Sequence, residues 1–414
     1  MIIKNVYDRK LLTFLFGNVS VFSIRFIYFI FLSFLLEISD LGLFATLISI
    51  ASLVLCFVSF GNYNLLMKRK SKGEDSFDVL SEYFLNSFVF LLCLMLLLVL
   101  IDDLGFSFFF NDFDIYILFK IIIAEFIFTS IPGLFKSASL SDYDGKIKKD
   151  AITNVVTSLL LLSSVILMYT VMSNNVLPLS SWSNIYLFIA IITISIRIFI
   201  WRDVIRMPRI NLIKVSIIKQ IKGGSYFMIA SLMRTSFLHI DKILIVSFLG
   251  LKMAGYYAIA FRFFNVMLMI TNSVSGVKEA KLYQLAVSNI SSFSDEVRLI
   301  NKKSMMFFMY TIPIWLVLLV FIYYVYSLDS VYIFVALFFI CPLQLISFTM
   351  LNALNSLSYE KERILILLLS FLLNISIVVF FNNSIGWLSV ILGLALSSSV
   401  VISISKIIIN RSVK

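Results

Sequence analysis

Histidine is almost absent from this sequence, because the 414 residues include only one, His239. Cysteine is also scarce, and Cys56, Cys93 and Cys341 all fall inside apolar stretches, where packing as small hydrophobic side chains is a better interpretation than a disulfide framework. With one histidine and no His/Cys cluster, the sequence predicts neither a metal site nor a Ser-His-Asp hydrolase. It also lacks the Walker A motif of ATPases. We therefore expect a protein that is not an enzyme and holds no cofactor.

Charge is missing from long stretches of the chain. Charged residues make up 14% of the sequence and hydrophobic residues 61%, and the mean hydropathy is +1.02. A bilayer-spanning helix needs about 20 mostly apolar residues. The sequence therefore predicts an all-α polytopic membrane protein with twelve transmembrane helices. Their expected ranges are 11–34, 41–61, 83–101, 115–137, 151–172, 185–202, 224–249, 253–276, 305–327, 330–352, 364–382 and 386–409.

Basic residues are nearly absent from every second gap between these helices. One set of alternating gaps holds 25 lysines and arginines, whereas the other set holds one, Lys252. The second set instead carries acidic residues: Glu37, Asp40, Asp102, Asp103, Asp112, Asp114 and Asp329. The positive-inside rule then places both termini in the cytoplasm. The net charge of +11 is accounted for by topology, so we expect a lipid bilayer and no nucleic acid as a partner.

The sequence also contains signs of an internal duplication. The predicted second helix opens with Gly42-Leu43-Phe44-Ala45 and the eighth with Gly255-Tyr256-Tyr257-Ala258, at an offset of 213 residues. The expected organisation is an N-terminal six-helix lobe over 1–210, a cytoplasmic interfacial linker helix over 211–223 and a C-terminal six-helix lobe over 224–414. Repeats of this kind place a substrate site between the halves. The alternative is that such short matches arise by chance in apolar sequence.

Several short motifs link the chain to a known family. They are Gly42-Leu43-Phe44, Gly61 with Leu65 and Lys68-Arg69, Asp241-Lys242-Ile243, Gly250, and the stretch from Ala254 to Arg262. With these motifs the sequence resembles the polysaccharide transporter branch of the multidrug/oligosaccharidyl-lipid/polysaccharide (MOP) exporters, and within it the O-antigen flippases. The resemblance implies two six-helix bundles around a central cavity, as in MATE-like proteins of the MOP fold.

The same resemblance implies a function and a location. The expected substrate is an undecaprenyl-pyrophosphate-linked oligosaccharide repeat unit, which is moved to the periplasmic leaflet of the bacterial inner membrane. An O-antigen polymerase and a chain-length regulator are further expected partners. The sequence does not define the oligomeric state, and a monomer is compatible with it.

Three arginines lie near the middle of predicted helices, where charge is costly. Arg25 belongs to the first helix, Arg234 to the seventh and Arg262 to the eighth. The resemblance implies that these helices face the cleft between the lobes. Guanidinium groups there would suit a pyrophosphate or an acidic sugar, because they bind phosphate bidentately and stay charged. The alternative is that each arginine pairs with an acid or with carbonyl groups and holds helices together.

Asp241 and Arg262 are predicted to lie at the same depth. They stand ten residues before and eleven after a tight turn near Leu251, so antiparallel helices would bring them level. The sequence therefore predicts an ion pair, beside Lys242, that is either a static brace or a gate opened by substrate. The expected carboxylate–guanidinium separation is under ~4 Å.

Other polar groups in the helices are candidates for energy coupling. Glu125, Asp241 and His239 could carry a proton or bind Na⁺, although Glu125 could instead pair with an arginine and His239 could simply be hydrogen-bonded. Arg197 lies nearer a helix end and is expected to extend toward the interface. Pro132, Pro313 and Pro342 are predicted to kink the fourth, ninth and tenth helices.

Two other functions compete with the flippase. A cation-coupled multidrug antiporter of the same superfamily would need acids in its cavity, whereas this chain offers mid-membrane arginines and few acids. A membrane enzyme of the O-antigen polymerase type would need a long external loop with arginines. The predicted external gaps are short and contain a single basic residue.

Overall fold

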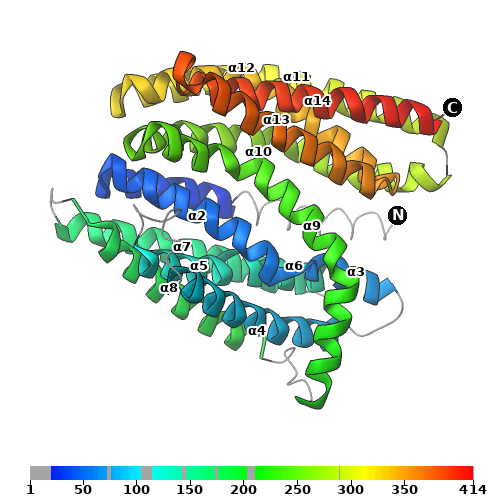
Figure 1. Cartoon of the computed structure of the whole chain (residues 1–414), viewed down its shortest axis with the longest axis horizontal. Helices are drawn as coiled ribbons and strands as arrows, with labels where there is room; N and C mark the ends of the chain where they lie inside the picture. Colours follow the sequence, from blue (N-terminus) through cyan, green and yellow to red (C-terminus); the bar gives the residue numbers. More distant parts are fainter. Residues whose placement is uncertain are drawn as a thin grey trace. The chain divides into compact units, whose positions relative to one another are not determined.

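The computed structural model describes residues 20–71, 76–103, 114–141, 146–172, 176–202, 210–288 and 290–413. Within these ranges the regular structure is helical (Figure 1). The helices are Ser20–Leu35, α2 (Ile38–Ser59), α3 (Asn62–Ser71), α4 (Ser76–Asp103), α5 (Ile115–Glu125), the π-helical turn η2 (Phe126–Ser130), α6 (Ile131–Ser141), α7 (Lys146–Met172), α8 (Leu179–Ile200), α9 (Ile210–Leu249), α10 (Leu251–Ser288), α11 (Ile290–Val325), α12 (Leu328–Ser356), α13 (Glu360–Ile385) and α14 (Leu388–Val413).

Within the described residues the predicted transmembrane helices are present as helices, and residues 11–19 of the first predicted span lie outside those residues. Nine helices in the described ranges are long and apolar enough to cross a membrane. The remaining three predicted spans correspond to Ser20–Leu35, α9 and α10. The predicted linker over 211–223 is not a separate helix, because α9 runs without a break from Ile210 to Leu249. The cytoplasmic location of both termini remains a prediction.

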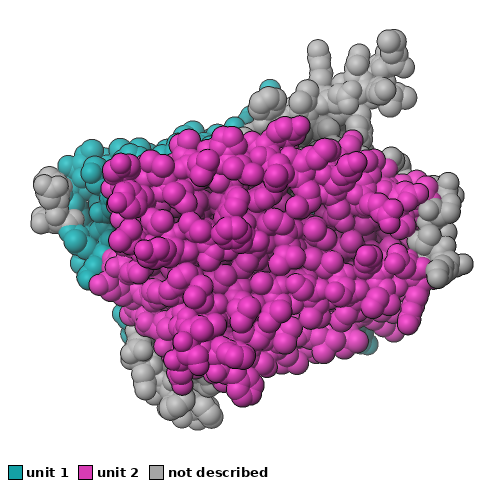
Figure 2. All heavy atoms as spheres, turned by 90° about the horizontal axis from the view of Figure 1, so that it is seen from above, with its two compact units in different colours: residues 1–37, 47–235 teal, residues 38–46, 236–414 magenta. Residues whose placement is uncertain are grey.

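The chain divides into two compact units, which Figure 2 shows in different colours. Unit 1 contains residues 1–37 and 47–235, and unit 2 contains residues 38–46 and 236–414. Both α2 and α9 therefore contribute to both units. The lobe boundaries drawn from the sequence differ from this division, because the opening turns of α2 belong to unit 2 and the first half of α9 to unit 1. Those lobe boundaries remain a prediction.

Two glycines attach the start of α2 to α10 within unit 2. A Cβ atom on Gly42 would overlap the backbone oxygen of Leu251, and one on Gly255 would overlap the backbone oxygen of Ile38. Because neither residue has a side chain, the two backbones come close together. The contact is reciprocal, since Ile38 and Leu251 are separated by the same 213 residues as Gly42 and Gly255. Reciprocity of this kind is typical of elements related by a two-fold axis.

Amide side chains organise one end of unit 1. The Gln220 amide on α9 donates to Asn62 Oδ1 on α3 and accepts from Asn86 Nδ2 on α4 at 2.7 Å. Asn62 in turn donates to Ser87 Oγ at 2.7 Å. All four side chains are buried. This chain of hydrogen bonds gives the buried amide groups polar partners and holds the first half of α9 against α3 and α4.

Unit 2 has an aromatic core. α10 packs against α11 and α12, and α13 packs against α14, which also contacts α12. At the centre lies Trp315 on α11, which is buried and stacks on Phe334 with ring centroids 4.9 Å apart. Phe338 and Phe264 contact the same indole at 5.1 and 6.2 Å. Rings of this size fill the space between three helices, and their offset and edge contacts add to the burial of apolar surface.

Candidate functional site

Arg25 of unit 1 lies in the first half of the helix Ser20–Leu35 and is half-buried. Its Nη2 donates to the backbone oxygen of Phe128 at 3.4 Å. That carbonyl belongs to η2, the single π-helical turn between α5 and α6. A carbonyl contact was one of the two alternatives that the sequence left open for this arginine. A guanidinium has five N–H donors, so the bond to Phe128 is compatible with an additional anionic partner.

The π-helical turn has a local cause in the sequence. Pro132 lies two residues after the end of this turn, and a proline ring clashes with the carbonyl four residues earlier, here that of Phe128. The widened turn, in which the Ile131 N–H bonds to Phe126 O, avoids this clash. The predicted disturbance of this helix at Pro132 therefore takes the form of a π bulge, a feature frequent at functional sites.

Glu125 immediately precedes this turn and is buried. Its Oε1 accepts a hydrogen bond of 2.6 Å from the hydroxyl of Tyr186 on α8. The Tyr186 ring packs against Phe128 at 4.9 Å and Trp182 at 6.0 Å. An arginine was one partner suggested by the sequence for Glu125, and Tyr186 was not predicted as a partner. The result is a polar pair enclosed by aromatic rings, which fixes α5 to α8.

A second buried charge cluster in unit 1 was not expected from the sequence. Arg197 was predicted to extend toward the interface, but this is wrong, since its side chain is buried inside the unit. Its Nη2 donates to Asn154 Oδ1 at 2.6 Å, and its Nη1 lies 3.5 Å from Asp150 Oδ1. Asp150 and Asn154 lie on α7, where they are also bonded to each other at 3.1 Å. Position near a helix end does not force a side chain outward when a buried carboxylate lies on the neighbouring helix.

Asp241 on α9 is the centre of a polar cluster in unit 2. The carboxylate is buried; Oδ1 lies 3.1 Å from Lys242 Nζ, and Oδ2 accepts a 2.5 Å hydrogen bond from the Tyr257 hydroxyl on α10. Lys242 also donates to the Leu238 carbonyl at 3.3 Å and lies 3.8 Å from the centroid of the Phe261 ring. A carboxylate, a backbone carbonyl and an aromatic face thus surround the ammonium group.

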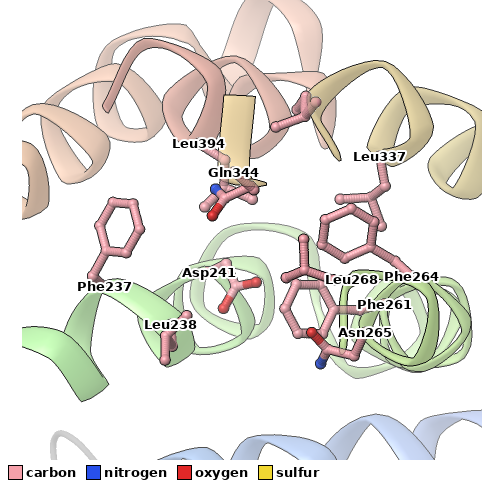
Figure 3. Close-up of a pocket in the computed structure, with 11 residues that line it drawn as sticks. Phe237, Leu238, Asp241, Phe261, Phe264, Asn265, Leu268, Leu337, Gln344 and Leu394 are labelled. Carbon is pink, nitrogen blue, oxygen red and sulfur yellow. The ribbon is translucent and has the colours of Figure 1, made fainter. Parts of the chain in front are cut away.

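A small pocket adjoins this cluster, and Figure 3 shows Asp241 between α9 and α10, with Gln344 on the α12 side. Its lining consists of Phe237, Leu238, Asp241, Phe261, Phe264, Asn265, Leu268, Leu337, Ile340, Gln344 and Leu394. Gln344 Nε2 donates to Ser398 Oγ on α14 at 2.9 Å. The α10 members recur at helical spacing, so one face of that helix forms a wall. Tyr257 and Gln344 were not among the residues expected from sequence.

The remaining candidate residues lie on α9 and α10. Arg234 is exposed, whereas His239 and Arg262 are half-buried. Arg25 and Arg234 belong to unit 1 and Arg262 to unit 2. Their meeting in one cleft therefore stays a prediction, as does the Asp241–Arg262 ion pair. In the described ranges, no group of three or more His, Cys, Asp or Glu side chains is arranged to hold a metal.

Comparison with known proteins identifies the family. No curated protein matches the chain by sequence. Residues 9–278 match the family described as polysaccharide biosynthesis protein. The chain belongs to this family. The match covers more than half of the sequence and includes the Arg25 and Glu125 region, the Asp241 cluster and Arg262.

Solved structures show the fold of this polysaccharide biosynthesis family member. The lipid II flippase MurJ, in an inward-closed conformation, aligns with a TM-score of 0.70 at 15% identity, covering 96% of this chain and 87% of MurJ. An inward-facing multidrug resistance MATE family transporter of the MOP superfamily gives 0.66 at 12% identity, covering 95% of each chain. A MOP superfamily transporter from Pyrococcus furiosus gives 0.62 at 13%, covering 97% and 95%. The predicted MATE-like MOP fold is therefore confirmed.

Proposed function

We propose that this protein is a flippase for lipid-linked oligosaccharides. It would move an undecaprenyl-pyrophosphate-linked O-antigen repeat unit from the cytoplasmic to the periplasmic leaflet of a bacterial inner membrane, by alternating access. The observation that carries the proposal is the polysaccharide biosynthesis family match over residues 9–278, on a chain with the MOP transporter fold. A polysaccharide-pathway protein built of membrane-crossing helices suits movement of a lipid-linked intermediate. The likeness to the lipid II flippase supports this at the level of fold.

The cationic residues are proposed to hold the pyrophosphate. Arg25, Arg234 and Arg262 are assigned this role because a planar guanidinium can bind two phosphate oxygens at once and remains charged in an apolar setting. The contact between Arg25 and the Phe128 carbonyl would orient one such group. Glu125 and Asp241 are proposed as the groups that couple transport to a gradient of H⁺ or Na⁺, since both are carboxylates buried in membrane helices.

Reconstitution tests the proposal directly. Purified protein would be placed in liposomes that contain undecaprenyl-pyrophosphate carrying a short fluorescent oligosaccharide, and a membrane-impermeant quencher would be added outside. We expect the protein to make the inner-leaflet label accessible to the quencher, while empty liposomes keep it protected. Triple replacement of the three arginines by alanine should abolish this movement. Replacement by lysine should restore it only in part, because lysine lacks the bidentate fork.

The same liposomes distinguish a flippase from the alternative function, a cation-coupled multidrug antiporter. Ethidium, a cationic drug, would be offered with an imposed H⁺ or Na⁺ gradient. Ethidium movement without any movement of the lipid-linked sugar would refute the flippase proposal. A lipid-linked sugar that moves only when it carries the O-antigen repeat of the source organism would support the finer assignment, whereas equal movement of unrelated sugars would contradict it.

A further inference from the structure

The Phe128 carbonyl lacks its ordinary helical partner. In an α-helix each carbonyl accepts from the N–H four residues later, and for Phe128 that residue is Pro132, which has no N–H. The π-helical turn moves this carbonyl away from the proline ring, as described above. An acceptor without its helical donor, inside an apolar bundle, needs another donor because an unsatisfied carbonyl costs free energy there.

Arg25 supplies that donor from a different helix. Its Nη2 lies 3.4 Å from Phe128 O, although the two residues are 103 positions apart in sequence. The carbonyl is held in place by its own side chain, since the Phe128 ring is buried and packs against Tyr186. On the same turn Phe126 packs against Phe88, with centroids 5.2 Å apart. The guanidinium of Arg25 is therefore bonded to a rigid point of the bundle.

We propose that Pro132 is a positioning residue for Arg25. By withholding an N–H, Pro132 leaves the Phe128 carbonyl available to the guanidinium, and this bond contributes to the orientation of a long side chain. The consequence for transport rests on the proposed function, in which Arg25 binds the pyrophosphate. A guanidinium that is oriented before the substrate arrives loses less conformational entropy on binding.

A double-mutant cycle tests the structural part without any substrate. Pro132→Ala restores an N–H that can donate to Phe128 O, so Arg25 should lose its bond. In thermal unfolding, Arg25→Met should clearly lower the melting temperature of the wild-type protein. In the Pro132→Ala background, the same substitution should lower the melting temperature by less than half of that amount. Pro313→Ala, the same change inside α11, is the matched control and should leave the effect of Arg25→Met intact. Equal effects of Arg25→Met in the wild-type and Pro132→Ala backgrounds would overturn the proposal.

A second variant separates the missing N–H from the proline ring. Nonsense suppression can place the hydroxy-acid analogue of alanine at position 132, which removes both the ring and the N–H. We expect this protein to retain the full effect of Arg25→Met, unlike Pro132→Ala. If it instead behaves like Pro132→Ala, the ring and not the absent donor is responsible, and the proposal fails. The hydroxy-acid variant also tests the proposal if Pro132→Ala does not fold.

The transport consequence is measured separately in the liposome assay. Pro132→Ala should raise the KM for the lipid-linked sugar several-fold while the maximal rate changes little, and the hydroxy-acid variant should restore the wild-type KM. An unchanged KM in Pro132→Ala would reject a role for the positioning in substrate binding. If no lipid-linked sugar moves with wild-type protein, the proposed function fails while the unfolding cycle still decides whether Pro132 positions Arg25.

Discussion

The two units bury a carboxylate beside a cation in different settings. In unit 1, Asp150 and Arg197 are buried and both bond the half-buried Asn154, and Phe135 lies against the guanidinium at 5.5 Å. In unit 2, Asp241 is equally buried and has Lys242 and Tyr257 as partners, yet it lines a pocket. Burial of a charge alone therefore does not identify a functional site. A charge sealed by its neighbours braces helices, whereas a charge at a pocket wall is within reach of a ligand or an ion.

The largest effect is expected where the charge is sealed. Arg197→Ala should destabilise the protein by about 3–5 kcal/mol, because the buried Asp150 would lose the arginine with which it is paired. Arg202→Ala, five residues further on, removes an exposed arginine that lies on the Phe199 ring and should cost little. Thermal or denaturant unfolding in detergent measures both. Similar losses of stability for the two variants would show that the Asp150–Arg197 cluster does not stabilise the packing of α7 against α8.

The next largest effect concerns the close contact between α2 and α10 in unit 2, which involves no charged side chain. Gly255→Ala should destabilise the protein by about 1–3 kcal/mol, since the new Cβ would overlap the Ile38 backbone and force the helices apart. Gly133→Ala is the control, because a Cβ there would meet no atom within 4 Å, and it should be neutral or slightly stabilising. Equal melting temperatures for the two variants would contradict the tight contact.

A smaller effect should identify the cation that pairs with Asp241. A double-mutant cycle with Asp241→Asn and Lys242→Met should give a coupling of about 1 kcal/mol, because either single change leaves one charged group buried without its partner. The parallel cycle with Asp241→Asn and Arg262→Gln tests the pair predicted from equal depth in the membrane. Stronger coupling to Arg262 than to Lys242 would favour that sequence-based pair over the contact in the structure.

The smallest effect is expected at Glu125. Tyr186→Phe removes one hydroxyl from an aromatic enclosure and should cost about 0.6 kcal/mol, the average for a hydrogen bond between membrane helices. Tyr169→Phe on α7, an exposed tyrosine, is the matched control and should not change stability. If Tyr186→Phe also removes the dependence of transport on the ion gradient, the Glu125 pair belongs with the Asp241 cluster and not with the sealed brace of Asp150.

Much of the architecture follows from the sequence because the bilayer constrains it strongly. A span must satisfy its own backbone hydrogen bonds in hydrocarbon, so a charge-free run of sufficient length becomes a helix. For this reason the sequence predicts twelve spans, and helices occupy the described parts of these spans in the structure. They include α9 and α10, which carry Arg234, Asp241 and Arg262. The depth of each polar residue along its own helix also follows from counting residues.

What the tertiary structure alone decides is the direction of those residues across helices. Spacing along one helix places its side chains relative to each other, but it leaves open how that helix is rotated against its neighbours. For this reason the α10 partner bonded to Asp241 in the structure is Tyr257, Glu125 accepts from Tyr186, and Arg197 turns inward to Asp150. The bond between Arg25 and the Phe128 carbonyl belongs to the same class, because only packing brings a proline-interrupted turn beside an arginine 103 residues away.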